Sequence, residues 1–283
     1  MSDPGDIRPL TGSIGAEISG LDINALDDAG TDFIQHAFDE HQVLFFPRQK
    51  LDDTQLVSFA KRLGEIQPPP AVLEGETGHP DVVVFETNRG AGVGKYNEVW
   101  HSDVSFAARP PSASILHAVT LPELGGDTLY ASMYAAYEAL SEPLKRVVEG
   151  LEALHDAAPS YSLFLMEPER KNGPERLKRM QNDGVGAVHP VVRRHPRTGR
   201  RALYVNRAFT TRILGVSEVE SRNLLSLLFE HAEQPRFQLR WRWSEGDLAM
   251  WDNRCAIHYA SFDYGQARRV VHRVTLTGDV PEA

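Results

Sequence analysis

The chain has little of the features that mark exported or membrane-spanning proteins. Cysteine occurs once, as Cys255, so no internal disulfide can form within the 283 residues. No apolar run approaches the roughly 20 residues that a membrane-spanning helix needs. Residues 1–6 are acidic and polar, unlike a secretory signal. We therefore expect a cytoplasmic protein with no membrane partner.

Positive charge is also scarce. The formal net charge is -9 and the isoelectric point is near 5.7. Proteins that bind nucleic acid normally carry a basic face or a high isoelectric point. The balance therefore predicts no nucleic-acid partner.

Two further absences concern domain organisation. The sequence has no internal repeat and no boundary rich in glycine, serine or proline that would divide it. Its hydrophobic share of 41% is enough for a sizeable core. We expect one domain over residues 1–283, with a mobile loop at 66–97 and a lid or insertion at 160–183.

Helix signals are few and are clearest at two capping boxes. Asp52 precedes Gln55 by three residues, and Ser217 precedes Glu220 in the same way. Ser141 is a candidate cap for the helix that contains Pro143 in its first turn. The predicted helices are 27–40, 52–63, 133–140, 143–151 and 217–231.

Short strand patterns dominate the rest, above all the last hundred residues. Strict alternation of strands and helices, as a doubly wound fold requires, is missing there. We predict a mainly β fold with flanking α, a sandwich or jelly roll decorated by helices. The predicted strands are 43–46, 81–86, 112–119, 127–131, 187–194, 202–206, 237–243, 248–251 and 270–278.

The strongest chemical signal is Trp100-His101-Ser102-Asp103, followed much later by His258. Residues two apart in a strand point to the same side, so His101 and Asp103 can reach one metal from one strand. Two histidines and one carboxylate leave coordination positions open, as in non-haem iron oxygenases. The spacing alone also fits an ordinary strand-end histidine.

A second signal is the run Arg268-Arg-Val-Val-His-Arg273 on a predicted strand. Alternation puts Arg269, Val271 and Arg273 on one side. Inward arginines are costly unless each finds an anion, and arginine pairs with carboxylates in a bidentate fork. One anionic co-substrate and one anionic substrate would satisfy both arginines, and so would two internal salt bridges.

These motifs together resemble the family of taurine dioxygenase and 2,4-dichlorophenoxyacetate dioxygenase. The likeness covers nearly the whole chain. It is carried by Gly15-Ala-Glu-Ile-Ser-Gly-Leu-Asp22, Val43-Leu-Phe-Phe-Pro47, Trp100-His-Ser-Asp-Val-Ser-Phe106, Gly125-Gly-Asp-Thr128, Trp251-Asp-Asn-Arg254, His258, the arginine run and Gly278-Asp-Val-Pro281.

The resemblance implies a double-stranded β-helix (a jelly roll) with helices outside. It implies Fe(II) held by His101, Asp103 and His258, with 2-oxoglutarate and O2 as co-substrates. Thr128 matches the position that hydrogen-bonds 2-oxoglutarate, and Arg269 matches the arginine that takes its distal carboxylate. It also suggests a homodimer or homotetramer.

The substrate side resembles taurine dioxygenase incompletely. Arg273 matches the arginine that receives the sulfonate, and the other matching pocket positions are Asn97, Val104, Ser160 and Tyr161. Taurine enzymes carry a histidine and a tyrosine in the loop that here reads Gln67-Pro-Pro-Pro-Ala-Val-Leu73. We expect a small anionic substrate, a sulfonate such as taurine or a related alkylsulfonate. Loss of both polar groups favours a more apolar substrate than taurine.

Other interpretations stay open. Within the same chemistry, the substrate could be an alkyl sulfate, an aryloxyalkanoate or a biosynthetic intermediate. A zinc hydrolase can also use two histidines and one aspartate, and a jelly roll can bind ligands without catalysis. Cys255 is interpreted as a small buried strand residue, because a catalytic cysteine needs a basic partner and a lowered pKa.

Overall fold

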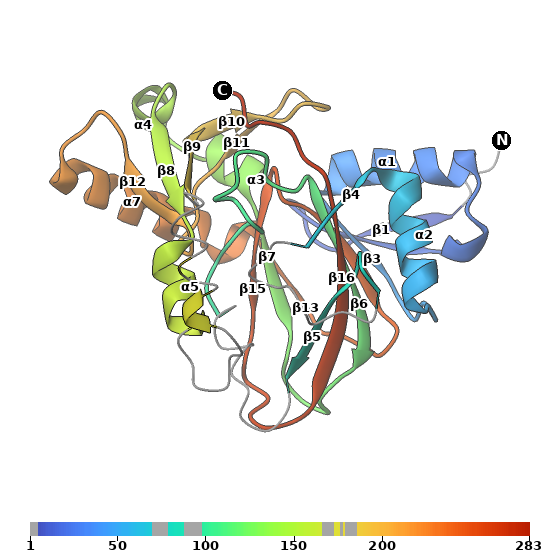
Figure 1. Ribbon diagram of the computed structural model, residues 1–283. Helices are drawn as coiled ribbons and strands as arrows, with labels where there is room; N and C mark the ends of the chain where they lie inside the picture. Colours follow the sequence, from blue (N-terminus) through green and yellow to red (C-terminus); the bar gives the residue numbers. More distant parts are fainter. Residues whose placement is uncertain (1–4, 70–78, 88–97, 166–172, 176–177, 179–185) are drawn as a thin grey trace.

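The computed structural model describes residues 5–69, 79–87, 98–165, 173–175, 178 and 186–283 (Figure 1). These parts are mainly β with several helices, as predicted. The helices are α1 (Asp28–His41), α2 (Asp53–Leu63), α3 (Met133–Glu138), α4 (Glu142–Val148), α5 (Ala158–Leu165) and α7 (Glu218–Ala232), with short 3-10 turns at Ile23–Ala25 and Pro235–Phe237. The strands are β1 (Asp6–Pro9), β2 (Ala16–Ser19), β3 (Val43–Phe46), β4 (Ile66–Gln67), β5 (Val83–Thr87), β6 (Ala113–Thr120), β7 (Thr128–Ser132), β8 (Glu152–Asp156), β9 (Gly186–Pro190), β10 (Val192–Arg194), β11 (Arg201–Leu203), β12 (Thr210–Ile213), β13 (Gln238–Trp241), β14 (Leu248–Asp252), β15 (Ala256–Ala260) and β16 (Arg269–Leu276).

Local sequence signals set the helix starts. Both predicted capping boxes form, with the Asp52 side chain on the Gln55 amide and the Ser217 side chain on the Glu220 amide. Ser141 caps α4 through the Leu144 amide. Side-chain oxygens at these positions accept N–H groups that have no partner inside the helix.

Two sheets face each other around the core that positions the site. The larger sheet has the order β1-β2-β3-β14-β6-β16-β4, with β5 also paired to β16, and the smaller has the order β13-β7-β15. Phe45 of β3, Tyr130 of β7 and Trp251 of β14 belong to one buried cluster between them. The Phe45 and Tyr130 rings meet edge to face at 5.6 Å.

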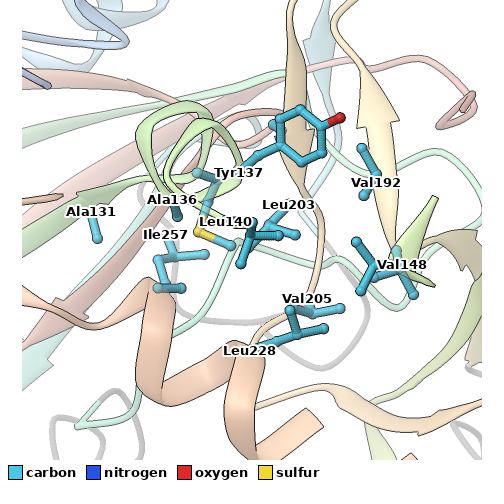
Figure 2. Close-up of a cluster of buried hydrophobic side chains, with 14 of the residues drawn as sticks. Ala131, Ala136, Tyr137, Leu140, Val148, Val192, Leu203, Val205, Leu228 and Ile257 are labelled. Carbon is cyan, nitrogen blue, oxygen red and sulfur yellow. The ribbon is translucent and has the colours of Figure 1, made fainter. Parts of the chain in front are cut away.

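Helices cover the outer faces of both sheets (Figure 1). Helices α1 and α2 bury Phe38 and Phe59 against the larger sheet. On the smaller sheet, Ala131 of β7 and Ile257 of β15 are paired and join a cluster with Leu228 of α7 (Figure 2). Side chains alternate along a strand. The residues adjacent to Ala131 and Ile257, namely Tyr130 and His258, therefore face the space between the sheets.

Two regional predictions were wrong in part. The predicted strand 187–194 is two strands, because the chain bends at Val191: β9 pairs with β8, and β10 pairs with β11. The predicted irregular segment 160–183 begins inside α5, where the Asp156 side chain accepts the Ala158 amide at the helix start. Most of the remainder, 166–172, 176–177 and 179–185, lies outside the described residues.

The predicted loop 66–97 contains the two-residue strand β4, which was not predicted, and β5, which matches the predicted strand 81–86. Residues 70–78 and 88–97 lie outside the described part. Strands β1, β2, β8, β12 and β15 were not predicted. Each has only four or five residues and lacks the continuous apolar run that marks the equally short β3 and β14. Over the described residues, no helix is both long and apolar enough to cross a membrane.

Candidate active site

His101 and His258 are brought together by backbone pairing. The His101 amide donates to the His258 carbonyl at 2.9 Å, and the His258 amide donates to the His101 carbonyl at 2.8 Å. The two ring centroids lie 4.0 Å apart. His258 is itself placed by β15, whose register puts it opposite Tyr130.

Asp103 reaches the same point by a turn, which corrects the prediction that it shares a strand with His101. His101 forms an isolated bridge, and the turn begins at Asp103. Val104 has φ of 50°, a conformation that is rare for a β-branched residue and costs on the order of 1–3 kcal/mol. The Asp103 amide donates to Asn253 Oδ1 at 3.2 Å, and the Ser102 hydroxyl donates to the Asn253 carbonyl at 2.7 Å. These contacts hold the strained turn.

The three side chains form a compact buried group. Asp103 Oδ1 lies 3.9 Å from Nε2 of His101 and 3.9 Å from Nε2 of His258, and the ligand atoms all lie within 4.8 Å of one another. His101 Nδ1 is 2.7 Å from the Val99 carbonyl. A carbonyl only accepts, so Nδ1 carries the proton and Nε2 keeps its lone pair for a metal.

The protonation states suit metal binding. Burial lowers the pKa of His101, and burial together with the neighbouring His101 ring lowers the pKa of His258 well below its usual value. Burial alone would raise the pKa of Asp103, but the Arg273 guanidinium and both histidines lower it to about 2. Two neutral imidazoles and one carboxylate with open positions fit iron(II).

Two other pairs have the His-x-Asp or His-x-Glu spacing, His79 with Asp81 and His231 with Glu233, and neither is part of this group. His79 Nδ1 accepts the Asp81 amide at 3.2 Å, which closes a local turn. His231 Nε2 is 2.8 Å from the Ala136 carbonyl, where it ties α7 to α3. Both histidines therefore have structural contacts.

Strand β16 presents Arg269, Val271 and Arg273 to the pocket that also contains His101 and His258. The predicted alternation is therefore confirmed. Arg269 Nε is buried without a hydrogen-bond partner in the described structure, and burial lowers the pKa of this guanidinium. A buried donor in this state favours an anion that none of the described residues supplies.

Arg273 behaves differently from Arg269. Its Nη1 donates to Asp103 Oδ1 at 2.8 Å, and its guanidinium lies 4.7 Å from the centre of the Phe85 ring. The internal salt bridge left open as an alternative is therefore present at Arg273. Its Nε is buried and has no partner among the described residues.

Thr128 and Arg269 line the same pocket, as the family resemblance implied. Trp243 Nε1 donates to Thr128 Oγ1 at 3.0 Å and sets the orientation of this side chain. A Cβ at Gly126 would lie 3.3 Å from Arg269 Nε, so glycine lets the turn approach the guanidinium. Tyr264 and Thr87 also line this end, with their hydroxyls 3.2 Å apart. Sequence reasoning missed both, since neither belongs to a spaced motif.

The remaining predicted pocket residues lie in different surroundings. Val104 is in an apolar cluster with Phe106 and Phe209, and Tyr161 packs against it. Tyr161 is stacked on Phe209 at 6.0 Å, and burial raises its pKa to about 12. Ser160 instead donates its hydroxyl to the Ala208 carbonyl. Asn97 lies outside the described residues.

Known proteins are similar to this chain over nearly its whole length. The model of the family "Taurine catabolism dioxygenase TauD, TfdA family" matches residues 6–275. An alkylsulfatase of Acinetobacter baylyi is 39% identical over 280 residues, covering 97% of this chain and 85% of the relative. An alpha-ketoglutarate-dependent sulfate ester dioxygenase of Pseudomonas putida is 40% identical over 287 residues, covering 98% and 90%.

Solved structures of related dioxygenases have the same fold. A taurine dioxygenase from Burkholderia xenovorans superposes with a TM-score of 0.79 at 37% identity, covering 98% of this chain and 92% of that one. The enzyme AAD-2, solved in complex with Mn(II) and N-oxalylglycine, superposes with a TM-score of 0.79 at 29% identity, covering 99% of both. The chain therefore belongs to the TauD, TfdA family of dioxygenases.

Proposed function

We propose that the protein is an iron(II)- and 2-oxoglutarate-dependent oxygenase that hydroxylates a small anionic substrate. The observation that carries this proposal is one pocket lined by His101, His258 and Arg269. The two histidines form a metal-binding group with Asp103, and Arg269 Nε has no hydrogen-bond partner among the described residues. When bound, iron(II) with 2-oxoglutarate and O2 supplies the oxidising chemistry that releases succinate and CO2.

The protein's own contribution begins with binding. We assign the metal to His101 Nε2, Asp103 Oδ1 and His258 Nε2, whose distances and lone pairs suit it. Arg269 would pair with the distal carboxylate of 2-oxoglutarate through a charge-assisted fork. Thr128, oriented by Trp243, would add a hydrogen bond at the same end. Trp251 and Tyr130 line the pocket with buried aromatic surface.

The architecture supports a finer description of the fold. We propose that the two facing sheets form a double-stranded β-helix and that residues 1–283 make one domain. Support comes from the buried cluster shared by β3, β6, β7, β14 and β16, with His258 on the inner face of the smaller sheet. On family likeness we also propose a cytoplasmic homodimer or homotetramer, which light scattering would test.

The substrate is proposed from Arg273 and its surroundings. Arg273 is the cation of the pocket on the side of Asp103, and the nearby cluster of Val104, Phe106 and Phe209 is apolar. Among the described residues lining the pocket there is no carboxylate to receive the ammonium of taurine. These features favour an alkylsulfonate or alkyl sulfate with an apolar tail, in line with the names of the two bacterial relatives.

The decisive test is succinate formation from 2-oxoglutarate. Anaerobically iron-loaded protein would be exposed to O2 with a panel of alkylsulfonates, alkyl sulfates and aryloxyalkanoates. We expect succinate to be stimulated by a member with an apolar tail, together with the matching aldehyde and sulfite or sulfate. Activity with zinc and no 2-oxoglutarate would instead indicate a hydrolase. Bound iron with no succinate under any condition would indicate a non-catalytic binding protein.

A further inference from the structure

A buried serine lies behind the carboxylate of the metal group. Ser114 is in the middle of the larger sheet, on β6, and has no exposed surface. Its hydroxyl donates to Asp103 Oδ2 at 2.6 Å, the short distance typical of a bond to an ionised carboxylate. Asn253 Nδ2 in turn donates to Ser114 Oγ at 2.9 Å.

The direction of these hydrogen bonds follows from chemistry. Asn253 Oδ1 faces two groups that only donate, the Asp103 amide at 3.2 Å and Trp251 Nε1 at 3.1 Å. The amide nitrogen of Asn253 must therefore face Ser114. Because Ser114 Oγ accepts from that nitrogen, its own hydrogen is directed to Asp103.

The two carboxylate oxygens of Asp103 thus have separate partners. Oδ2 is taken by Ser114, while Oδ1 faces the two histidine nitrogens at 3.9 Å and accepts from Arg273. Rotation of the carboxylate would break the Ser114 bond and leave a buried hydroxyl hydrogen without an acceptor, which costs about 1–3 kcal/mol.

We infer that Ser114, oriented by Asn253, is a positioning residue that presents Asp103 to the metal through Oδ1 alone. This inference rests on the metal site proposed above. Holding Oδ2 keeps the carboxylate from taking a second coordination position, which the co-substrates need. Partners of this kind typically account for 10- to 100-fold, roughly, in metal affinity or activity.

The test is metal affinity without turnover. Mn(II) would be titrated into metal-free protein and its dissociation constant measured, together with the melting temperature of each metal-free variant. Two matched pairs isolate the hydroxyl: wild type against Ser114→Ala, and Ser114→Thr against Ser114→Val. The second pair has nearly equal volume, so it remains informative if a packing change alone disturbs the site.

Ser132 provides the control. It is equally buried, and its hydroxyl donates over the same 2.6 Å, but to the side chain of Gln42 instead of a metal ligand. It also caps α3, so Ser132→Ala should lower the melting temperature, as the loss of a cap worth about 1 kcal/mol would. Its Mn(II) affinity should stay at the wild-type level.

We expect each variant without the Ser114 hydroxyl to bind Mn(II) about 10- to 100-fold more weakly than its hydroxyl-bearing counterpart. Equal affinities within both pairs would overturn the positioning role while leaving the metal site intact. An equal loss in Ser132→Ala would also overturn it, since the effect would then follow stability. Failure of the wild type itself to bind Mn(II) would instead overturn the proposed function.

Discussion

Two buried groups in this protein carry almost the same side chains but differ in what their atoms can do. His101, Asp103 and His258 form one, and His195, Asp252 and Cys255 form the other; in each, the ligand atoms lie within 4.8 Å of one another. Strand β14 and the turn after it contribute to both, through Asn253 behind the first and Asp252 in the second. Residue type and distance therefore do not separate them.

In the second group, the histidine and the aspartate are both held by hydrogen bonds within the protein. His195 Nε2 lies 3.0 Å from Asp252 Oδ2, and its Nδ1 accepts the backbone amides of Arg197 and Thr198. Both oxygens of Asp252 accept from Arg254, at 2.8 and 2.7 Å. Burial raises the pKa of Cys255 well above its usual value, so this residue stays a thiol, which supports the structural interpretation.

The first group is left incomplete. Nε2 of His101 keeps a lone pair, and Nε2 of His258 lies 3.9 Å from Asp103 Oδ1, beyond hydrogen-bond distance. Arg273 donates to Asp103 through a single nitrogen. Arg254 donates to Asp252 through two side-chain nitrogens and through its backbone amide. The comparison teaches that uncommitted lone pairs, more than ligand identity, distinguish a metal site from a structural network.

The largest predicted effect tests the first group directly. His101→Ala or Asp103→Ala should abolish iron binding and turnover, because two ligands cannot hold the metal in this pocket. Iron content and succinate formation are the measurements. Full activity in either variant would remove the basis of the comparison.

The second group should respond in stability instead. Asp252→Asn leaves the buried Arg254 guanidinium without its carboxylate, which should lower the free energy of unfolding by about 3–5 kcal/mol. Denaturant unfolding of the metal-free protein measures this loss. Iron stoichiometry of the folded fraction should remain one per chain; its loss would mean that the two groups are not independent.

Arg269→Ala tests the arginine whose Nε has no partner among the described residues, in contrast to Arg273, which is bonded to Asp103. It should raise the concentration of 2-oxoglutarate needed for half-maximal rate by about 10²-fold or more, since a charge-assisted fork is lost. Steady-state kinetics in 2-oxoglutarate is the measurement. Arg269→Lys, which keeps the charge but not the fork, is the matched control and should fall between.

Arg273→Ala should reduce the use of substrate and leave the requirement for 2-oxoglutarate nearly unchanged. The reason is that Arg273 is bonded to Asp103 and lies four residues along β16 from Arg269, about 13 Å in an extended strand. Kinetics in substrate and in 2-oxoglutarate would be compared. A large effect on 2-oxoglutarate alone would show that the two arginines have exchanged roles.

The smallest effect concerns pH. The folded pKa of His258 lies below that of the unfolded chain, so the unfolded protein binds the proton first as pH falls. The metal-free protein should therefore lose stability below about pH 6.5, by up to about 1.4 kcal/mol per pH unit for each such histidine. His258→Gln should make this dependence shallower. An unchanged slope between pH 6.5 and 4 would contradict the assignment.

Short-range signals accounted for much of what could be predicted. The capping boxes at Asp52 and Ser217 form as expected, because a cap depends on residues only three positions apart. The inward side of β16 was equally readable from alternation. Strand β15 was missed, although it carries His258, because the polar His258 interrupts its short apolar run.

What the sequence by itself determined was the inventory of the site: two histidines, an aspartate, two arginines on one strand face and the motifs that mark the family. Only the tertiary structure decided how they are used. It put Asp103 on a turn, tied that carboxylate to Arg273 and Ser114, and left Arg269 Nε without a partner among the described residues. These contacts join residues 11 to 170 positions apart, and such pairing depends on strand register, which local patterns do not specify.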